Sequence, residues 1–103
     1  MAWILLGLAG VLEIVWAYYM KLSNGFTRLV PTSITLIAMI GSFALLSYSM
    51  RTLPLGTAYM IWTGIGAVGA FIVGIVVLGE PVTTGRILGA VLIAGGLVLM
   101  KAS

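Results

Sequence analysis

The chain opens with Met1-Ala-Trp-Ile-Leu-Leu-Gly-Leu-Ala-Gly-Val-Leu-Glu-Ile-Val-Trp16, an apolar run that contains one acid, Glu13. No Lys or Arg lies within seven residues of that acid. A charged side chain at the centre of a membrane-spanning helix is costly, about 2.5–3.5 kcal/mol on insertion scales. Intramembrane acids therefore mark ion or substrate pathways, and Glu13 is the first candidate for a functional residue.

The composition of the whole chain is that of a membrane protein. Its 103 residues are 62% hydrophobic and only 7% charged, with a mean hydropathy of +1.28. Soluble domains carry about 25% charged residues, and a chain this small could not bury so much apolar surface. The N-terminal run has no basic region and carries an acid, so we expect a retained first span rather than a signal peptide.

Four apolar runs approach the roughly 17–25 residues that a spanning helix needs. They cover about residues 2–20, 31–50, 55–78 and 86–100, and the segments between them are polar and contain Gly or Pro, as turns do. The fourth run is short, so we expect it to be little tilted or partly interfacial. The sequence thus predicts an all-α membrane protein, with residues 1–103 forming a single domain of four transmembrane helices.

The residue inventory excludes several classes of function. The chain has no Cys and no His, which removes disulfides, thiolate metal sites and imidazole catalysis. Its five Lys and Arg residues are scattered singly, as interfacial anchors are, rather than clustered on one face as in nucleic-acid binders. No activated nucleophile or metal-ligand cluster accompanies Glu13. We therefore expect no enzyme activity, no cofactor and no nucleic-acid partner.

With catalysis and metal binding excluded, Glu13 is expected to bind its ligands reversibly. Burial disfavours the charged form of a carboxylate, so such a group can bind a proton or an organic cation, and the two compete. Competition at one site that is exposed alternately to each side of the membrane is sufficient for proton-coupled antiport.

The charges in the loops indicate how the chain is oriented. Lys21, Arg28 and Arg86 fall on one side of the membrane, and Arg51 and Lys101 fall on the other with the N-terminal amine. The positive charges are thus nearly balanced between the two sides, and they favour neither orientation strongly. The chain can therefore insert both ways and pair with an inverted copy, as inverted repeats do within larger transporters. Two copies would also provide enough helices to wall a chamber around two glutamates. The sequence predicts an antiparallel, dual-topology homodimer.

The neighbours of Glu13 on its own helix face are small or aromatic. Gly10 and Ala17 leave room for a ligand, and Trp16 lies one turn away. The Trp16 indole offers an N–H to a carboxylate and a π-face to a cation. A lipid-facing aromatic is the alternative reading.

Three further side chains are candidates for a cation site. Tyr59 and Trp62 share a helix face and can wall such a site, although packing near an aromatic belt is equally compatible with their spacing. Ser42 is a mid-membrane hydroxyl, but serines at such positions more often bond the carbonyl four residues earlier in their own helix.

The segment Gly64-Ile-Gly-Ala-Val-Gly69 matches the dinucleotide pattern G-x-G-x-x-G. It lies in an apolar helix with no preceding strand, so we reject a dinucleotide site. Gly64 and Gly66 are instead expected to loosen the helix and permit a kink. Gly66, Ala70 and Gly74 form a small-residue surface for close helix packing.

Taken together, these residues resemble the small multidrug resistance family, and more closely its guanidinium-exporter branch, over essentially the whole chain. The matching pieces are Leu12-Glu-Ile-Val-Trp-Ala17, Lys21, Ser23-Asn-Gly-Phe-Thr-Arg28, Pro31, Leu53-Pro-Leu-Gly-Thr-Ala-Tyr59, Ile61-Trp-Thr-Gly-Ile-Gly-Ala67, Gly79-Glu-Pro81 and Lys101. The resemblance implies a four-helix, multi-pass protein of the bacterial plasma membrane. Such proteins form antiparallel dual-topology homodimers and exchange protons for cations through one glutamate in the first helix.

The resemblance also implies residue roles. Glu13 matches the glutamate that binds proton and substrate, and the shell that positions it matches Trp16, Ser42, Tyr59 and Trp62. Trp16 and the segment Trp62-Thr-Gly-Ile-Gly66 favour the guanidinium branch. This chain departs from the usual pattern at Tyr18, Tyr19 and Met60, whose bulk could reshape the entrance to the site.

The expected function is proton-coupled export of guanidinium or a related small cation, with protons and membrane lipid as the other partners. One alternative is an antiporter for quaternary ammonium or other bulky cations. A less favoured alternative is a membrane subunit that transports nothing. An obligate heterodimer is disfavoured because paired subunits usually carry opposite charge biases.

Overall fold

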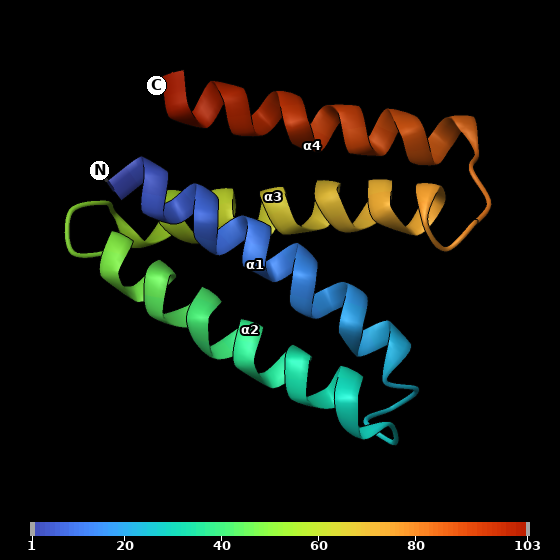
Figure 1. Ribbon diagram of the computed structural model, residues 1–103. Coiled ribbons are helices and arrows are strands. Elements are labelled where there is room, and N and C mark those ends of the chain that lie inside the picture. The colour runs from blue at the N-terminus through green and yellow to red at the C-terminus, as the bar shows by residue number, and fades with distance from the viewer. Residues whose placement is uncertain (1, 103) are drawn as a thin grey trace.

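The computed structural model describes residues 2–102, which form four α-helices. They are α1 (Ala2–Leu22), α2 (Leu29–Ser49), α3 (Leu55–Val76) and α4 (Thr84–Ala102). Each is long and apolar enough to cross a membrane. The helices run alternately in opposite directions, so that the α1–α2 and α3–α4 connections lie at one end and the α2–α3 connection lies at the other with both termini (Figure 1). The expected N-terminal amine belongs to residue 1, which lies outside the described residues.

The helix ends differ from the predicted spans for local reasons. α2 begins at Leu29, two residues before Pro31. The helix can include Pro31 because a proline in the first turn lacks only an N–H that the helix leaves unpaired there. α4 is 19 residues long and exceeds the predicted span at both ends. Thr83 extends its start, because its hydroxyl accepts a hydrogen bond from the Arg86 N–H at 3.2 Å. The expectation of a short fourth helix was therefore wrong.

The other two helices also end at positions set by hydrogen bonds. α1 runs two residues beyond its predicted end, to Leu22. α3 stops at Val76 rather than residue 78. Gly79 takes a left-handed conformation with φ of +68°, and the Glu80 N–H bonds the Gly74 carbonyl at 3.0 Å. A glycine adopts this left-handed conformation at a helix end without steric cost.

The turn between α1 and α2 is built around Ser23, which is fully buried. Its hydroxyl donates to the Met20 carbonyl at 2.6 Å and accepts from the Phe26 N–H at 3.1 Å. Its carbonyl accepts from the N–H groups of Thr27 and Arg28 at 2.9 and 3.1 Å. These bonds hold a left-handed backbone at Asn24, Gly25 and Phe26, with φ of +50°, +73° and +67°. The turn is thus closed by its own hydrogen bonds.

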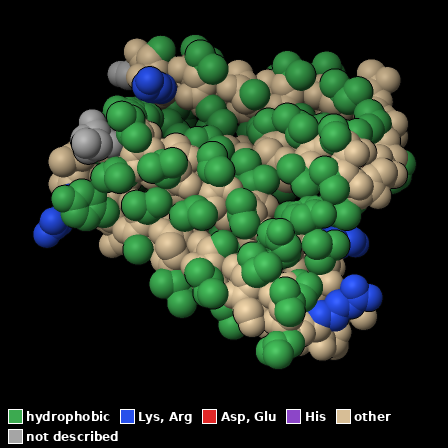
Figure 2. All heavy atoms as spheres, viewed as in Figure 1, with side chains coloured by type: hydrophobic (Ala, Val, Ile, Leu, Met, Phe, Trp, Pro, Cys, Tyr) green, Lys and Arg blue, Asp and Glu red, His purple; other side chains and the backbone are tan. Residues whose placement is uncertain are grey.

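The helices do not pack evenly around a centre. α1 packs against both α2 and α3, whereas the backbone of α4 approaches only that of α3 (Figure 1). The buried core lies where the first three helices meet, and α4 contributes no buried residue among those described. Hydrophobic side chains are spread over the whole face shown in Figure 2, and the visible Lys and Arg side chains lie toward the ends of the helices. A surface of this kind suits a bilayer rather than water.

Candidate functional site

Glu13 lies on α1 and its carboxyl group packs directly against Gly66 of α3. A side-chain carbon at position 66 would collide with Glu13 Oε1. The neighbouring contacts are equally close, because Ile65 of α3 packs on Gly10 and Ile14 of α1 packs on Gly69. Glycines on both helices therefore let the two backbones approach one another on either side of the acid.

Ser42 of α2 joins the three inner helices through two hydrogen bonds. Its hydroxyl donates to the Ala9 carbonyl of α1 at 2.7 Å and accepts from Trp62 Nε1 of α3 at 2.9 Å. The Ser42 side chain is fully buried. In a continuous α-helix the Ala9 carbonyl also accepts the backbone N–H of Glu13, four residues on. The Ser42 hydroxyl and the backbone N–H of Glu13 therefore share one acceptor, the Ala9 carbonyl.

This bonding differs from the arrangement that is more common for a serine within a membrane. Two other buried hydroxyls of α2 do bond their own helix, Thr35 to the Pro31 carbonyl at 2.8 Å and Ser49 to the Leu45 carbonyl at 2.9 Å. Ser42 instead uses its donor on a neighbouring helix. The sequence could not predict that the Ala9 carbonyl accepts this bond, because every residue has a backbone carbonyl.

Four aromatic rings form a continuous row beside the Ser42 bonds. Trp16 contacts Phe43 edge-on at 6.3 Å between centroids. Phe43 lies 5.7 Å from Trp62, which lies 5.7 Å from Tyr59. The row thus brings together Trp16, Tyr59 and Trp62 from two helices, with Phe43 of α2 between the tryptophans. Sequence reasoning missed Phe43 as a site residue, although it is the aromatic next to Ser42.

The row lies at the surface of the single chain rather than in its interior. Phe43 is 47% exposed and Tyr59 is 52% exposed, whereas Trp62 is buried. Aromatic faces attract cations, and the attraction strengthens where water is excluded. A second surface that covered this row would therefore enclose a chamber with aromatic walls.

Two polar atoms near the row are buried without a hydrogen-bond partner among residues 2–102. They are Glu13 Oε1 and Trp16 Nε1. The hydrogen bond that the sequence suggested between these two side chains is therefore not made within the chain. Buried polar groups are nearly always bonded in proteins. A carboxylate oxygen in this state can accept a proton or the N–H of a cation.

The two glycines expected to kink α3 have identifiable neighbours. Gly64 lies against Leu97 of α4, and Gly66 lies against Glu13. Both are buried, and α3 continues as one helix through them. Their observed part is to allow close packing, and a kink at this point stays a prediction. No group of three metal-ligating side chains gathers anywhere in the described part of the chain.

Comparison with known proteins places the chain among membrane transporters. The family model described as Small Multidrug Resistance protein matches residues 1–93. A protein of Citrobacter freundii named "Guanidinium exporter" is 56% identical over 103 residues, which is 100% of this chain and 98% of that relative. A protein of the same name from Yersinia pseudotuberculosis is 55% identical over 101 residues, with 98% and 97% coverage.

Proposed function

The chain belongs to the Small Multidrug Resistance family, and on that premise we propose that it exchanges guanidinium for protons at Glu13. The relatives that are 55–56% identical over nearly their whole length carry the name "Guanidinium exporter". Four helices able to span a bilayer make the chain a multi-pass protein of the bacterial inner membrane. A function in transport, rather than in catalysis, follows from the same relatives.

The observation that carries the proposed mechanism is the buried, unpartnered carboxylate oxygen of Glu13. A proton and guanidinium each satisfy it, and only one can do so at a time. Binding of the cation therefore requires release of the proton, and binding of a proton releases the cation. If the site opens to one side of the membrane at a time, this exclusion couples outward movement of guanidinium to inward movement of protons.

The surrounding residues suit guanidinium by shape and charge. The ion is planar, with N–H donors around its edge, and so can bond a carboxylate in a bidentate manner. Its faces can stack on aromatic rings, and the row from Trp16 to Tyr59 supplies such rings. Ser42 holds the α1 backbone that carries Glu13, and its bond orients Trp62.

A homodimer of two oppositely oriented chains fits the same features. The exposed faces of Phe43 and Tyr59 would be covered, and a second Glu13 would join the chamber. The cations divide three to two between the ends of the molecule, Lys21, Arg28 and Arg86 against Arg51 and Lys101. That near balance supports insertion in both directions.

The test is transport in liposomes with a matched pair of variants. The chain has two acids, so Glu13→Gln removes the proposed site and Glu80→Gln removes the same charge from the α3–α4 connection. We expect guanidinium-driven proton movement to be lost in Glu13→Gln and retained in Glu80→Gln. Exchange by folded Glu13→Gln protein would refute the mechanism.

Antiport of bulkier organic cations is a second candidate. The aromatic row is longer than guanidinium needs, and Tyr18 and Tyr19 add another ring pair with centroids 5.2 Å apart. Tetraalkylammonium in the same liposomes separates the two functions. Proton movement with tetraalkylammonium and none with guanidinium would assign the chain to bulky cations. A chain that only modulates another membrane protein would move protons with neither.

A further inference from the structure

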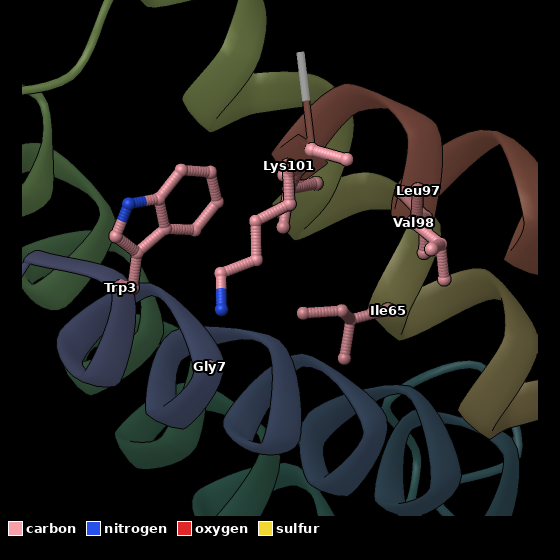
Figure 3. Close-up of a pocket in the computed structure, with 8 residues that line it drawn as sticks. Trp3, Gly7, Ile65, Leu97, Val98 and Lys101 are labelled. Atoms are coloured by element: carbon pink, nitrogen blue, oxygen red, sulfur yellow. The ribbon is translucent and has the colours of Figure 1, made fainter.

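A cavity lies away from the Glu13 site, between the start of α1, the middle of α3 and the end of α4. Its volume is about 590 Å³. Figure 3 shows Trp3 and Gly7 on one side of it, Leu97 and Val98 on the other, and Ile65 beneath, with the Lys101 side chain reaching across. The cavity exists because the backbone of α4 approaches only α3 and leaves space beside α1. None of the five proposed site residues lines it.

The chemistry of this cavity is opposite to that of the Glu13 site. Among residues 2–102, its one charged lining residue is Lys101, whose Nζ lies 5.5 Å from the centre of the Trp3 ring. Neither acid of the chain is in its lining. The other lining side chains are apolar. A positive charge at one end repels the proposed cationic substrate, and the apolar interior has little to bond water. The occupant that matches both parts is an amphiphile with an anionic head.

The position of the cavity in a bilayer narrows the choice further. Trp and Lys near helix ends lie at the level of the lipid headgroups, and Lys101 is in the last turn of α4 while Trp3 is in the first turn of α1. The apolar lining extends from there toward the hydrocarbon region. An acyl chain that lies in this open pocket gains dispersion contacts with its apolar lining.

We propose that this cavity binds one acyl chain of an anionic phospholipid, whose phosphate pairs with Lys101. One Lys near a membrane surface favours anionic lipid by about fivefold, the equivalent of about 1 kcal/mol. The proposal is independent of what the Glu13 site transports.

Quenching of Trp3 fluorescence by lipids with brominated acyl chains measures occupancy at the site itself. The chain has three tryptophans, so a Trp16→Phe/Trp62→Phe background leaves Trp3 as the reporter. In vesicles we expect brominated phosphatidylglycerol to quench about fivefold more effectively, per lipid, than brominated phosphatidylcholine. The same preference is read in the unaltered chain by native mass spectrometry, which counts the retained lipids and does not depend on the background.

Two pairs of variants separate the charge from the cavity. Lys101→Gln should abolish the preference, whereas Arg51→Gln should keep it. Arg51 also lies over an aromatic ring, 5.2 Å from the centre of Tyr48, but does not line this cavity. A carbon added at Gly7 meets nothing within 4 Å, so Gly7→Leu should fill the space and reduce quenching by both lipids. Gly95→Leu, which is equally open but outside the lining, should not.

Three results would overturn the proposal. Equal binding of the two lipids by the unaltered chain would remove the role of the charge. A preference that survives Lys101→Gln in folded protein would assign it to another residue. Absence of quenching by either lipid would mean that protein, such as a second copy of the chain, covers the cavity.

Discussion

Replacement of Ser42 by Ala tests whether this hydroxyl holds the inner helices together. The change removes one oxygen and leaves the methylene in place, so the packing volume is almost unchanged. It breaks the bonds to the Ala9 carbonyl and from Trp62 Nε1. The carbonyl keeps its helical partner, the Glu13 N–H. The buried indole N–H keeps none, and this unpaired donor sets the size of the effect.

The magnitude follows from what is known of such groups. An unsatisfied buried donor costs about 1–3 kcal/mol, while hydrogen bonds between membrane helices average about 0.6 kcal/mol and reach about 1.7. We expect Ser42→Ala to lower the free energy of unfolding by about 1–2 kcal/mol. If the same distortion reaches Glu13, guanidinium affinity should fall by about 5–30-fold.

Unfolding by dodecyl sulfate in mixed micelles measures the stability, and guanidinium-driven proton movement in liposomes measures the site. Thr35→Val is the matched control, because Thr35 is buried on the same helix and its hydroxyl bonds only the Pro31 carbonyl of that helix. It should change both quantities by less than about 0.5 kcal/mol. A double-mutant cycle with Trp62→Phe should give a coupling near 1 kcal/mol. Equal effects of Ser42→Ala and Thr35→Val would refute the reasoning.

Three further outcomes are expected. Gly66→Ala should reduce guanidinium transport at least tenfold, the equivalent of about 1.4 kcal/mol, because the added carbon collides with the Glu13 carboxyl. Gly7→Ala is the control: its added carbon meets open space, so transport rates should stay near normal. Guanidinium binding, measured by calorimetry, should weaken as the pH is lowered, since protons compete for Glu13; affinity that is unchanged from pH 9 to pH 5 would contradict this. Gly79→Ala should destabilise the folded chain by about 1–2 kcal/mol in the dodecyl sulfate assay, because φ there is +68°, and an equal loss in Gly85→Ala, which has no such strain, would argue against that cause.

The four-helix fold could be predicted from the sequence because its strongest signal, a run of apolar residues, lies within each helix. Four apolar runs separated by polar turns predict four membrane helices, and each was found. The helix ends were harder to predict, because they depend on single hydrogen bonds such as that of the Thr83 hydroxyl with the Arg86 N–H. The apolar run begins only at Ile87, so hydropathy does not locate the start of α4 at Thr84.

The sequence singles out candidate site residues but does not predict how they are arranged. Glu13 was conspicuous because its charge is expensive in a membrane, and Tyr59 and Trp62 were paired by helical spacing. Contacts between helices were not predictable from spacing along one helix. The bond from Ser42 to the Ala9 carbonyl and the position of Gly66 under Glu13 depend on how α1 rotates against its neighbours. Phe43 was overlooked for the same reason.

The turn at Ser23 has a consequence for biosynthesis. Since its hydrogen bonds all lie within residues 19–28, α1 and α2 can associate as a hairpin while α3 and α4 are still in the ribosome. The translocon then receives two helices joined by a preformed reversal, with Lys21 and Arg28 on the same short connection. We expect this hairpin to enter the bilayer as one unit in either orientation, because the cations on all the connections together give little bias.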